Sequence, residues 1–176
     1  MTLTYTWPLL DSLKPGHLAR IRGCIPKEGK RFDVNFQNEF EYSKSDLMLH
    51  ISMRYSDGNG FIVTNTKNEN GWMPEEMHRN IAIEPGVDFE LLILCDFDKY
   101  QIALDGNHIC NYSHKLPYTE VKCLGIRGEV ILNLISLEDN TQPEIDLSAT
   151  NYRNPLSLEI VPEKKLKKKI VRCRIS

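Results

Sequence analysis

The sequence lacks the features that mark membrane proteins, secreted proteins and metal-stapled domains. Its 176 residues contain no apolar run of about 18 residues, so no transmembrane helix is predicted. The first residues provide neither a basic segment nor an apolar stretch, so no secretory signal is visible. The five cysteines are scattered and form no C-x-x-C pair, which argues against a zinc site or a disulfide framework. We therefore expect free, buried thiols in a reducing compartment.

Signatures of catalysis are missing as well. There is no G-x-S-x-G, H-E-x-x-H, Walker loop or dinucleotide glycine pattern. Glu75 and Glu76 are adjacent, so on a strand they point to opposite faces and cannot flank one glycosidic bond. His108, Cys110 and His114 share a parity, but the histidines straddle a turn and Cys110 is expected to pack. The sequence predicts a protein that is not an enzyme and holds no metal or cofactor.

Charge divides the chain into two parts. Residues 161–176 contain seven Lys or Arg and one acid, whereas the other 160 residues have a net charge of −8. The acidic body and the basic tail therefore need separate explanations. The tail can be read as a solvated segment or terminal strand, or as a patch for polyanions or nuclear import. The length predicts one domain, or one domain with an appendage.

Alternation of apolar and polar residues dominates the first 137 positions. In the segment 31–36, Phe32, Val34 and Phe36 share one face. The segment 46–54 places Leu47, Leu49, Ile51 and Met53 on one face and Met48, His50, Ser52 and Arg54 on the other. Glycine-rich turns separate the expected strands, which are 18–24, 31–36, 46–54, 60–66, 71–73, 87–95, 98–104, 107–112, 120–126 and 129–136. Short strands at this spacing predict an all-β sandwich or barrel.

One polar face of these strands has the residue types that bind sugars. His50, Ser52 and Arg54 follow each other at every second position of 46–54, and the next segments add an amide, an indole and a carboxylate. Sugar hydroxyls take fixed hydrogen bonds from such groups, and the C–H face of a sugar ring packs on an aromatic ring. The full candidate set is His50, Ser52, Arg54, Asn65, Trp72, Glu75 and Arg79.

At these residues the chain resembles the galectins, whose pattern reads H-x-N-x-R, V-x-N and W-G-x-E-x-R. The corresponding segments here are 50–54, 63–65 and 72–77. Four further segments resemble family motifs in order, namely 14–17, 31–36, 112–115 and 124–130. The resemblance covers residues 5–137 and implies a two-sheet antiparallel β-sandwich of the jelly-roll, concanavalin-like type.

The resemblance also implies a role for each residue of the set. His50 would bind the axial 4-hydroxyl of galactose, and Arg54 would bind the same hydroxyl and the ring oxygen. Asn65 and Glu75 would hold the 6-hydroxyl, and Trp72 would stack under the apolar face of the sugar. Glu75 would also orient the Arg54 guanidinium.

Three positions depart from the family pattern. Ser52 replaces an asparagine, which keeps a hydroxyl but loses reach and one donor. Met73, followed by Pro74, replaces the glycine after the tryptophan. Met77 replaces the last arginine, and Arg79 on the same strand face is the candidate substitute. Losing one hydrogen bond to a charged donor costs about 1.5–3 kcal/mol, so these changes bear directly on affinity.

Together these observations predict a galectin-like carbohydrate-recognition domain over residues 1–137 and a linker with a basic extension over 138–176. The extension also resembles the opening of a second galectin domain, which is the third reading of the tail. The predicted function is recognition of β-galactoside glycans or glycoproteins. The alternative is a galectin fold that no longer binds galactosides and acts through protein contacts. Homo-oligomers or a second domain are the expected partners, rather than membranes or nucleic acid, in the cytoplasm or outside cells by a signal-independent route.

Overall fold

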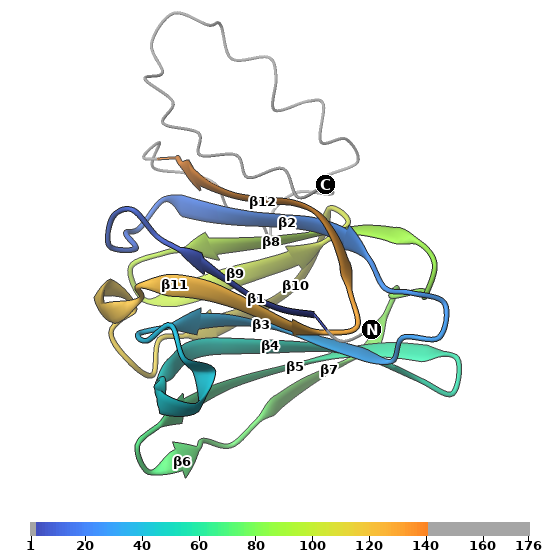
Figure 1. The fold of residues 1–176 in the computed structure, drawn as a ribbon, viewed down its shortest axis with the longest axis horizontal. Helices are drawn as coiled ribbons and strands as arrows, with labels where there is room; N and C mark the ends of the chain where they lie inside the picture. The colour runs from blue at the N-terminus through green and yellow to red at the C-terminus, as the bar shows by residue number, and fades with distance from the viewer. Residues whose placement is uncertain (1–2, 141–176) are drawn as a thin grey trace, which may run out of the picture.

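The computed structural model describes residues 3–140, which form two antiparallel β-sheets packed face to face (Figure 1). The strands are β1 (Leu3–Pro8), β2 (His17–Cys24), β3 (Arg31–Gln37), β4 (Leu47–Ser56), β5 (Asn59–Asn68), β6 (Gly71–Trp72), β7 (Glu76–Ile81), β8 (Asp88–Cys95), β9 (Lys99–Leu104), β10 (Asn107–Ser113), β11 (Cys123–Gly128) and β12 (Ile131–Asp139). Two short 3-10 helices, η1 (Tyr42–Lys44) and η2 (Tyr118–Glu120), lie in loops.

The seven-stranded sheet has the order β1-β11-β3-β4-β5-β6, with β7 also pairing β5, and the five-stranded sheet has the order β10-β9-β8-β2-β12. The predicted all-β sandwich is therefore confirmed. No helix within residues 3–140 is long and apolar enough to cross a bilayer.

Aromatic side chains join the two sheets through the core. Phe32, Val34 and Phe36 of β3 are at most 2% exposed, as their alternation predicted. Phe32 stacks on Phe89 of β8 with ring centroids 5.0 Å apart, and Phe36 meets Tyr100 of β9 at 5.5 Å. Because this layer fills the space between the sheets, the opposite face of β3 and its neighbours is free to hold polar groups.

A β-bulge at the start of β4 interrupts the alternation that the sequence predicts. The β4–β5 register shifts between Leu47 and His50, and the β3–β4 register shifts between Phe36 and Gln37. Met48 consequently belongs to the main core, although the sequence placed it on the polar face. From His50 onward the predicted alternation is restored, so the extra residue leaves His50, Ser52 and Arg54 on one face.

Other differences concern two strands that the sequence did not predict and the ends of two strands that it did. The sequence did not predict β1 or β7, and the strand expected from residue 120 begins at Cys123 because η2 precedes it. Glu138 and Asp139, whose composition suggested a linker, are the last residues of β12 and pair with β2. Residues 141–176, with the predicted basic extension, lie outside the described part of the chain.

The cysteines and the histidine cluster have structural explanations. Cys95, Cys110 and Cys123 are free and buried, as predicted, whereas Cys24 is partly exposed. The prediction that His108 and Cys110 lie on the same face of the strand is wrong, because a β-bulge between them shifts the register. His114 instead donates from Nε2 to the carbonyl of Asp96 at 2.9 Å. Within residues 3–140 no group of three or more His, Cys, Asp and Glu is placed to hold a metal ion.

Candidate functional site

Strand register brings the predicted polar residues together on the outer face of the seven-stranded sheet. In one row across β3, β4 and β5, Asn35 lies opposite His50 and His50 opposite Asn65. The next row contains Ser52, which lies opposite Val63 of β5. Directly opposed residues of antiparallel strands share a face with Cβ atoms about 5 Å apart, so these side chains are neighbours.

A tight turn after β5 places the tryptophan beside this row. Gly71 has φ +108°, a conformation that L side chains rarely adopt, and it allows the chain to reverse into β6. Trp72 then pairs with Lys67, and the rings of Trp72 and His50 lie in a T-shaped arrangement with centroids 4.8 Å apart. Trp72 is 48% exposed, so much of the indole surface stays accessible to a ligand.

A hydrogen-bond chain fixes the tautomer of His50. The Asn35 amide donates from Nδ2 to the carbonyl of Gly125 at 3.5 Å, which directs its Oδ1 toward the histidine. His50 Nδ1 lies 2.6 Å from that oxygen, and since an amide oxygen only accepts, Nδ1 carries the proton. The lone pair of Nε2 is then available to accept a hydrogen bond.

His50 is neutral at neutral pH. Burial lowers its pKa to about 4, reinforced by Arg31 and Arg54 and opposed by the carboxylate of Asp33. The imidazole therefore offers one committed donor and one acceptor across the physiological range. A neutral acceptor of this kind suits the hydroxyl of a sugar.

Ser52 orients Arg54. The Nε of Arg54 donates to Ser52 Oγ at 2.9 Å, and Ser52 is fully buried. The Arg54 guanidinium keeps its terminal nitrogens as donors. The predicted pairing of Glu75 with Arg54 is not among the hydrogen bonds or ion pairs of residues 3–140. On the next strand, Arg31 forms a two-point ion pair with Asp33 at 2.9 and 3.1 Å.

Asn65 and Glu75 complete the polar set. Asn65 is 6% exposed, and its Oδ1 accepts from the backbone N–H of Thr66 at 2.7 Å, which leaves its NH2 group as a donor. Glu75 is exposed in the segment between β6 and β7. A carboxylate there provides only acceptors.

Five of the seven predicted residues line one pocket of about 380 Å³, together with Arg31, Val63 and Met73. The predicted residues in its wall are His50, Arg54, Asn65, Trp72 and Glu75. Ser52 is not in the pocket wall, and it contributes by accepting the hydrogen bond from Arg54 Nε. Arg79 is not in the pocket wall, but it lies opposite Phe61, which lies opposite Arg54, so it shares the same face two strands away.

The sequence-based set missed Asn35, Arg31, Val63 and Met73. Alternation already placed Arg31 and Asn35 opposite the apolar face of 31–36, and that parity is the signal that could have included them. What one sequence could not supply is the register that sets Asn35 against His50 and Arg31 against Arg54.

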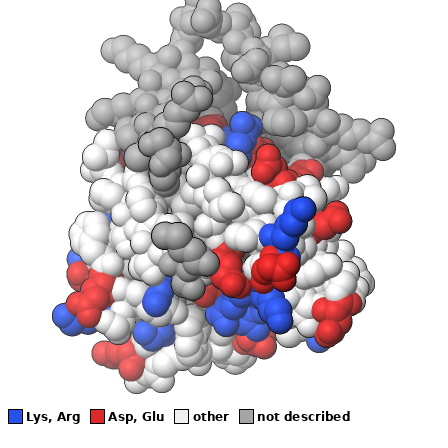
Figure 2. Space-filling view, turned by 45° about the vertical axis from the view of Figure 1, so that its right-hand side comes forward, with Lys and Arg blue, Asp and Glu red and all other residues white. Residues whose placement is uncertain are grey.

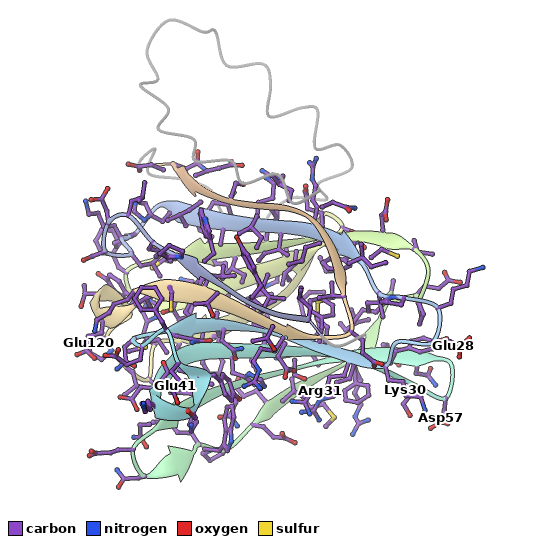
Figure 3. The ribbon with its side chains drawn as sticks, viewed as in Figure 1. Glu28, Lys30, Arg31, Glu41, Asp57 and Glu120 are labelled. Carbon is purple, nitrogen blue, oxygen red and sulfur yellow. The ribbon has the colours of Figure 1, made fainter. Side chains whose placement is uncertain are left out.

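Charges of both signs are mixed on the side of the molecule that Figure 2 shows. Figure 2 shows basic side chains next to acidic ones in the lower part of the visible face, without a broad patch of one sign. In Figure 3, Arg31 is labelled toward one end of the seven-stranded sheet and Glu41 toward the other, beside η1. The pocket wall contains both Arg54 and Glu75, and its Arg31 is paired with Asp33, so the site suits a neutral ligand better than a polyanion, whose binding requires clustered cations.

Fold and site together define a carbohydrate-recognition domain, and the family comparison agrees. The model of the family described as galactoside-binding lectin matches residues 4–137. The chain therefore belongs to the galactoside-binding lectins, the galectins.

Individual relatives share about a third of the aligned residues. Rat galectin-8 is 33% identical over 135 residues, which are 76% of this chain and 42% of that protein. A 32 kDa β-galactoside-binding lectin of Haemonchus contortus is 32% identical over 126 residues, covering 71% of this chain and 44% of that protein. The chain thus spans less than half of the length of these relatives.

A solved structure shows the same sandwich. Sheep galectin-11, in complex with glycerol, superposes with a TM-score of 0.67 and 26% identity. The superposition covers 76% of this chain and 96% of that one. The jelly-roll sandwich predicted from the sequence motifs is thereby confirmed.

Proposed function

We propose that this protein is a lectin that binds β-galactoside glycans in the pocket lined by His50, Arg54, Asn65, Trp72 and Glu75. The observation that supports it best is the convergence of these five side chains, from β4, β5, β6 and the following loop, on one open pocket. The names of the relatives, which are galactoside-binding lectins, point the same way.

The chemistry of the pocket matches one sugar ring. Nε2 of His50 accepts from a hydroxyl, the Arg54 nitrogens and the Asn65 amide donate, and the Glu75 carboxylate accepts. An axial 4-hydroxyl contacted by both His50 and Arg54 would distinguish galactose from glucose. Trp72 supplies a flat apolar surface for the C–H face of the ring.

Calorimetric titration with lactose, using maltose as the control, tests the proposal. Lactose ends in galactose and maltose in glucose, so saturable heat from lactose alone is the expected result. Equal heats from the two sugars, or none from lactose at millimolar concentration, would contradict it. The second outcome would favour the alternative of a galectin fold that works through protein contacts.

Replacing Ser52 by asparagine is expected to tighten lactose binding about 2- to 12-fold, since one added hydrogen bond contributes about 0.5–1.5 kcal/mol. The amide oxygen can still accept from Arg54, as the Ser52 hydroxyl does, while the longer side chain adds an NH2 group as a further donor for the sugar. Ser52→Ala is the matched control and should weaken binding, because Arg54 loses its partner. Titration of the three proteins with lactose measures both effects.

Arg79 is proposed to contact the second sugar. It lies two strands from Arg54, about 10 Å away at the usual strand spacing, and it has no ion pair within residues 3–140. Arg79→Ala should therefore weaken lactose about five-fold, or ~1 kcal/mol, and leave methyl β-galactoside unchanged. An equal loss for both ligands would place Arg79 at the first sugar instead.

The reducing cytoplasm is the proposed location, with signal-independent export as a second destination. Burial raises the pKa of Cys95 and Cys110 to about 12, which keeps these thiols protonated and unreactive. Free thiols of this kind are usual in reducing compartments. Glycoproteins are the proposed partners, and a homo-oligomer or a second lectin domain would strengthen binding by avidity.

A further inference from the structure

A carboxylate beside the proposed sugar pocket, Asp33 of β3, has no part in the function proposed above. Asp33 lies opposite Ser52 of β4 and opposite Arg127 of β11, so it shares the outer face of the sheet with the pocket residues. Its side chain is 17% exposed and accepts two hydrogen bonds from Arg31. Because Arg31 is in the pocket wall and is labelled in Figure 3, this ion pair brings a negative charge to the β3 side of the pocket.

The charge of Asp33 acts on groups to either side of it. Burial lowers the pKa of His50, and the Asp33 carboxylate opposes that shift. Burial raises the pKa of Tyr42, and the same carboxylate adds to that shift. His50 lines the sugar pocket, whereas Tyr42 lines a neighbouring hollow of about 360 Å³ that is also bordered by β1 and β11. Asp33 therefore lies close to the boundary between the pocket and this hollow.

The proposed orientation of galactose directs its 3-hydroxyl toward β3. In that orientation the 4-hydroxyl is at His50 and Arg54 on β4, and the 6-hydroxyl is at Asn65 on β5 and at Glu75. Carbon 4 of the ring is flanked by carbon 5, which carries carbon 6, and by carbon 3. Because β4 lies between β3 and β5, a ring whose carbon 5 faces β5 has its carbon 3 toward β3. A substituent on the 3-hydroxyl would extend over the ion pair.

The ion pair changes what such a substituent meets. An anionic group such as a sulfate is normally held by an arginine through two parallel hydrogen bonds. The Nε of Arg31 and one of its terminal nitrogens already donate to Asp33, at 2.9 and 3.1 Å. The carboxylate would also repel an anion at this short range. A neutral substituent has neither the need for Arg31 nor the repulsion.

Two further arginines near this position have other contacts. The Nε of Arg54 donates to Ser52, and its terminal nitrogens are the proposed donors for the 4-hydroxyl. Arg127 has its guanidinium over the ring of Tyr42, 4.0 Å from the ring centroid, and stacking of this kind holds the cation against the ring. An anionic group on the 3-hydroxyl would therefore depend on the availability of Arg31.

We propose that Asp33 determines the charge selectivity of the sugar site. By holding Arg31, it prevents an anionic group on the galactose 3-hydroxyl from strengthening binding, so the protein selects neutral galactosides. Replacing Asp33 by a neutral residue frees Arg31 and turns the β3 side of the pocket into an anion site. The inference rests on the proposed galactoside binding and adds the class of galactoside to it.

Calorimetric titration with two sugars tests this selectivity. The sugars are lactose and lactose that carries a sulfate on the 3-hydroxyl of galactose. We expect the wild-type protein to bind the sulfated sugar no more tightly than lactose. Asp33→Asn keeps the shape of the side chain and removes its charge. Its affinity for the sulfated sugar, relative to lactose, should rise about ten-fold, which corresponds to one hydrogen bond to a charged group. High salt should reduce this gain, because it screens charges.

Three matched variants show whether Arg31 provides the gain. Asp33→Glu keeps a carboxylate next to Arg31, so its ratio of affinities should be that of the wild type. Asp98→Asn removes the same charge from an exposed turn in the other sheet and should also leave the ratio unchanged. Adding Arg31→Gln to Asp33→Asn should abolish the gain.

The two titrations separate failure of the selectivity from failure of the sugar site. Lactose binding without a change of ratio in Asp33→Asn would overturn the role of Asp33 and leave the lectin function standing. A wild-type protein that binds the sulfated sugar about ten-fold more tightly than lactose would overturn it too, because Arg31 would then be available despite the ion pair. Absence of lactose binding in the wild type would overturn the proposed function and this inference together.

Discussion

Trp72→Ala will lower the affinity for lactose by about 30- to 150-fold. The indole is the large apolar surface in the pocket wall and is 48% exposed without ligand, so it becomes buried only when the sugar packs on it. Burying a large apolar side chain contributes about 2–3 kcal/mol, which converts to this range. Calorimetry with lactose measures the loss directly.

Phe97→Ala is the matched control for this experiment. Phe97 is an exposed aromatic residue at 79% and lies in the turn between β8 and β9, in the sheet that lacks the pocket. Its removal should leave lactose binding unchanged. Because Trp72 is half exposed, Trp72→Ala should unfold at nearly the wild-type urea concentration. A Trp72→Ala protein that still binds lactose like the wild type would contradict the proposed site.

The polar face of β4 and β5 was predictable because a strand has a fixed period. Once His50, Ser52 and Arg54 are on one strand, only parity is needed to place them together, and the antiparallel neighbour brings Asn65 alongside. Trp72 and Glu75 could be added because the family motif names them. Local pattern and motif thus supplied five of the eight residues that line the pocket without any knowledge of register.

Interactions between strands were not predictable in this way. The bulge at Leu47 moves Met48 into the core, and no residue type in 46–54 signals an extra residue there. Asn35 was not predicted for the same reason, because its importance comes from lying opposite His50 on the neighbouring strand and not from its neighbours in sequence. Glu75 illustrates the reverse case, since the family motif predicted its contact with Arg54 but Ser52 makes that contact here.

Acidification will destabilise the protein through His50. The unfolded chain has a histidine of ordinary pKa, near 6.5, while burial lowers the folded pKa to about 4. Between these values the unfolded state binds more protons, so the free energy of unfolding falls as the pH falls. From pH 7 to pH 4 the loss attributable to His50 is about 3 kcal/mol.

His50→Gln isolates this contribution. Glutamine keeps a polar side chain beside Asn35 but does not titrate, so urea unfolding of this variant should lose about 3 kcal/mol less than the wild type between pH 7 and pH 4. The pKa values of His17 and His78 are also lowered by burial, but both residues are present in the two proteins and cancel in the comparison. Equal pH slopes for the two proteins would show that His50 is not buried neutral.

Sugar binding should respond to acid over a different range. Because His50 titrates in the folded protein only near pH 4, its Nε2 stays an acceptor from pH 8 down to pH 5. Lactose affinity is therefore expected to be flat over that interval, even while stability declines, and to fall once Nε2 is protonated below about pH 4. If the affinity instead fell with a midpoint near pH 6.5, His50 would have an ordinary pKa. The hydrogen bond from His50 Nδ1 to Asn35 could then not be what keeps the imidazole neutral with Nε2 as the acceptor for the sugar.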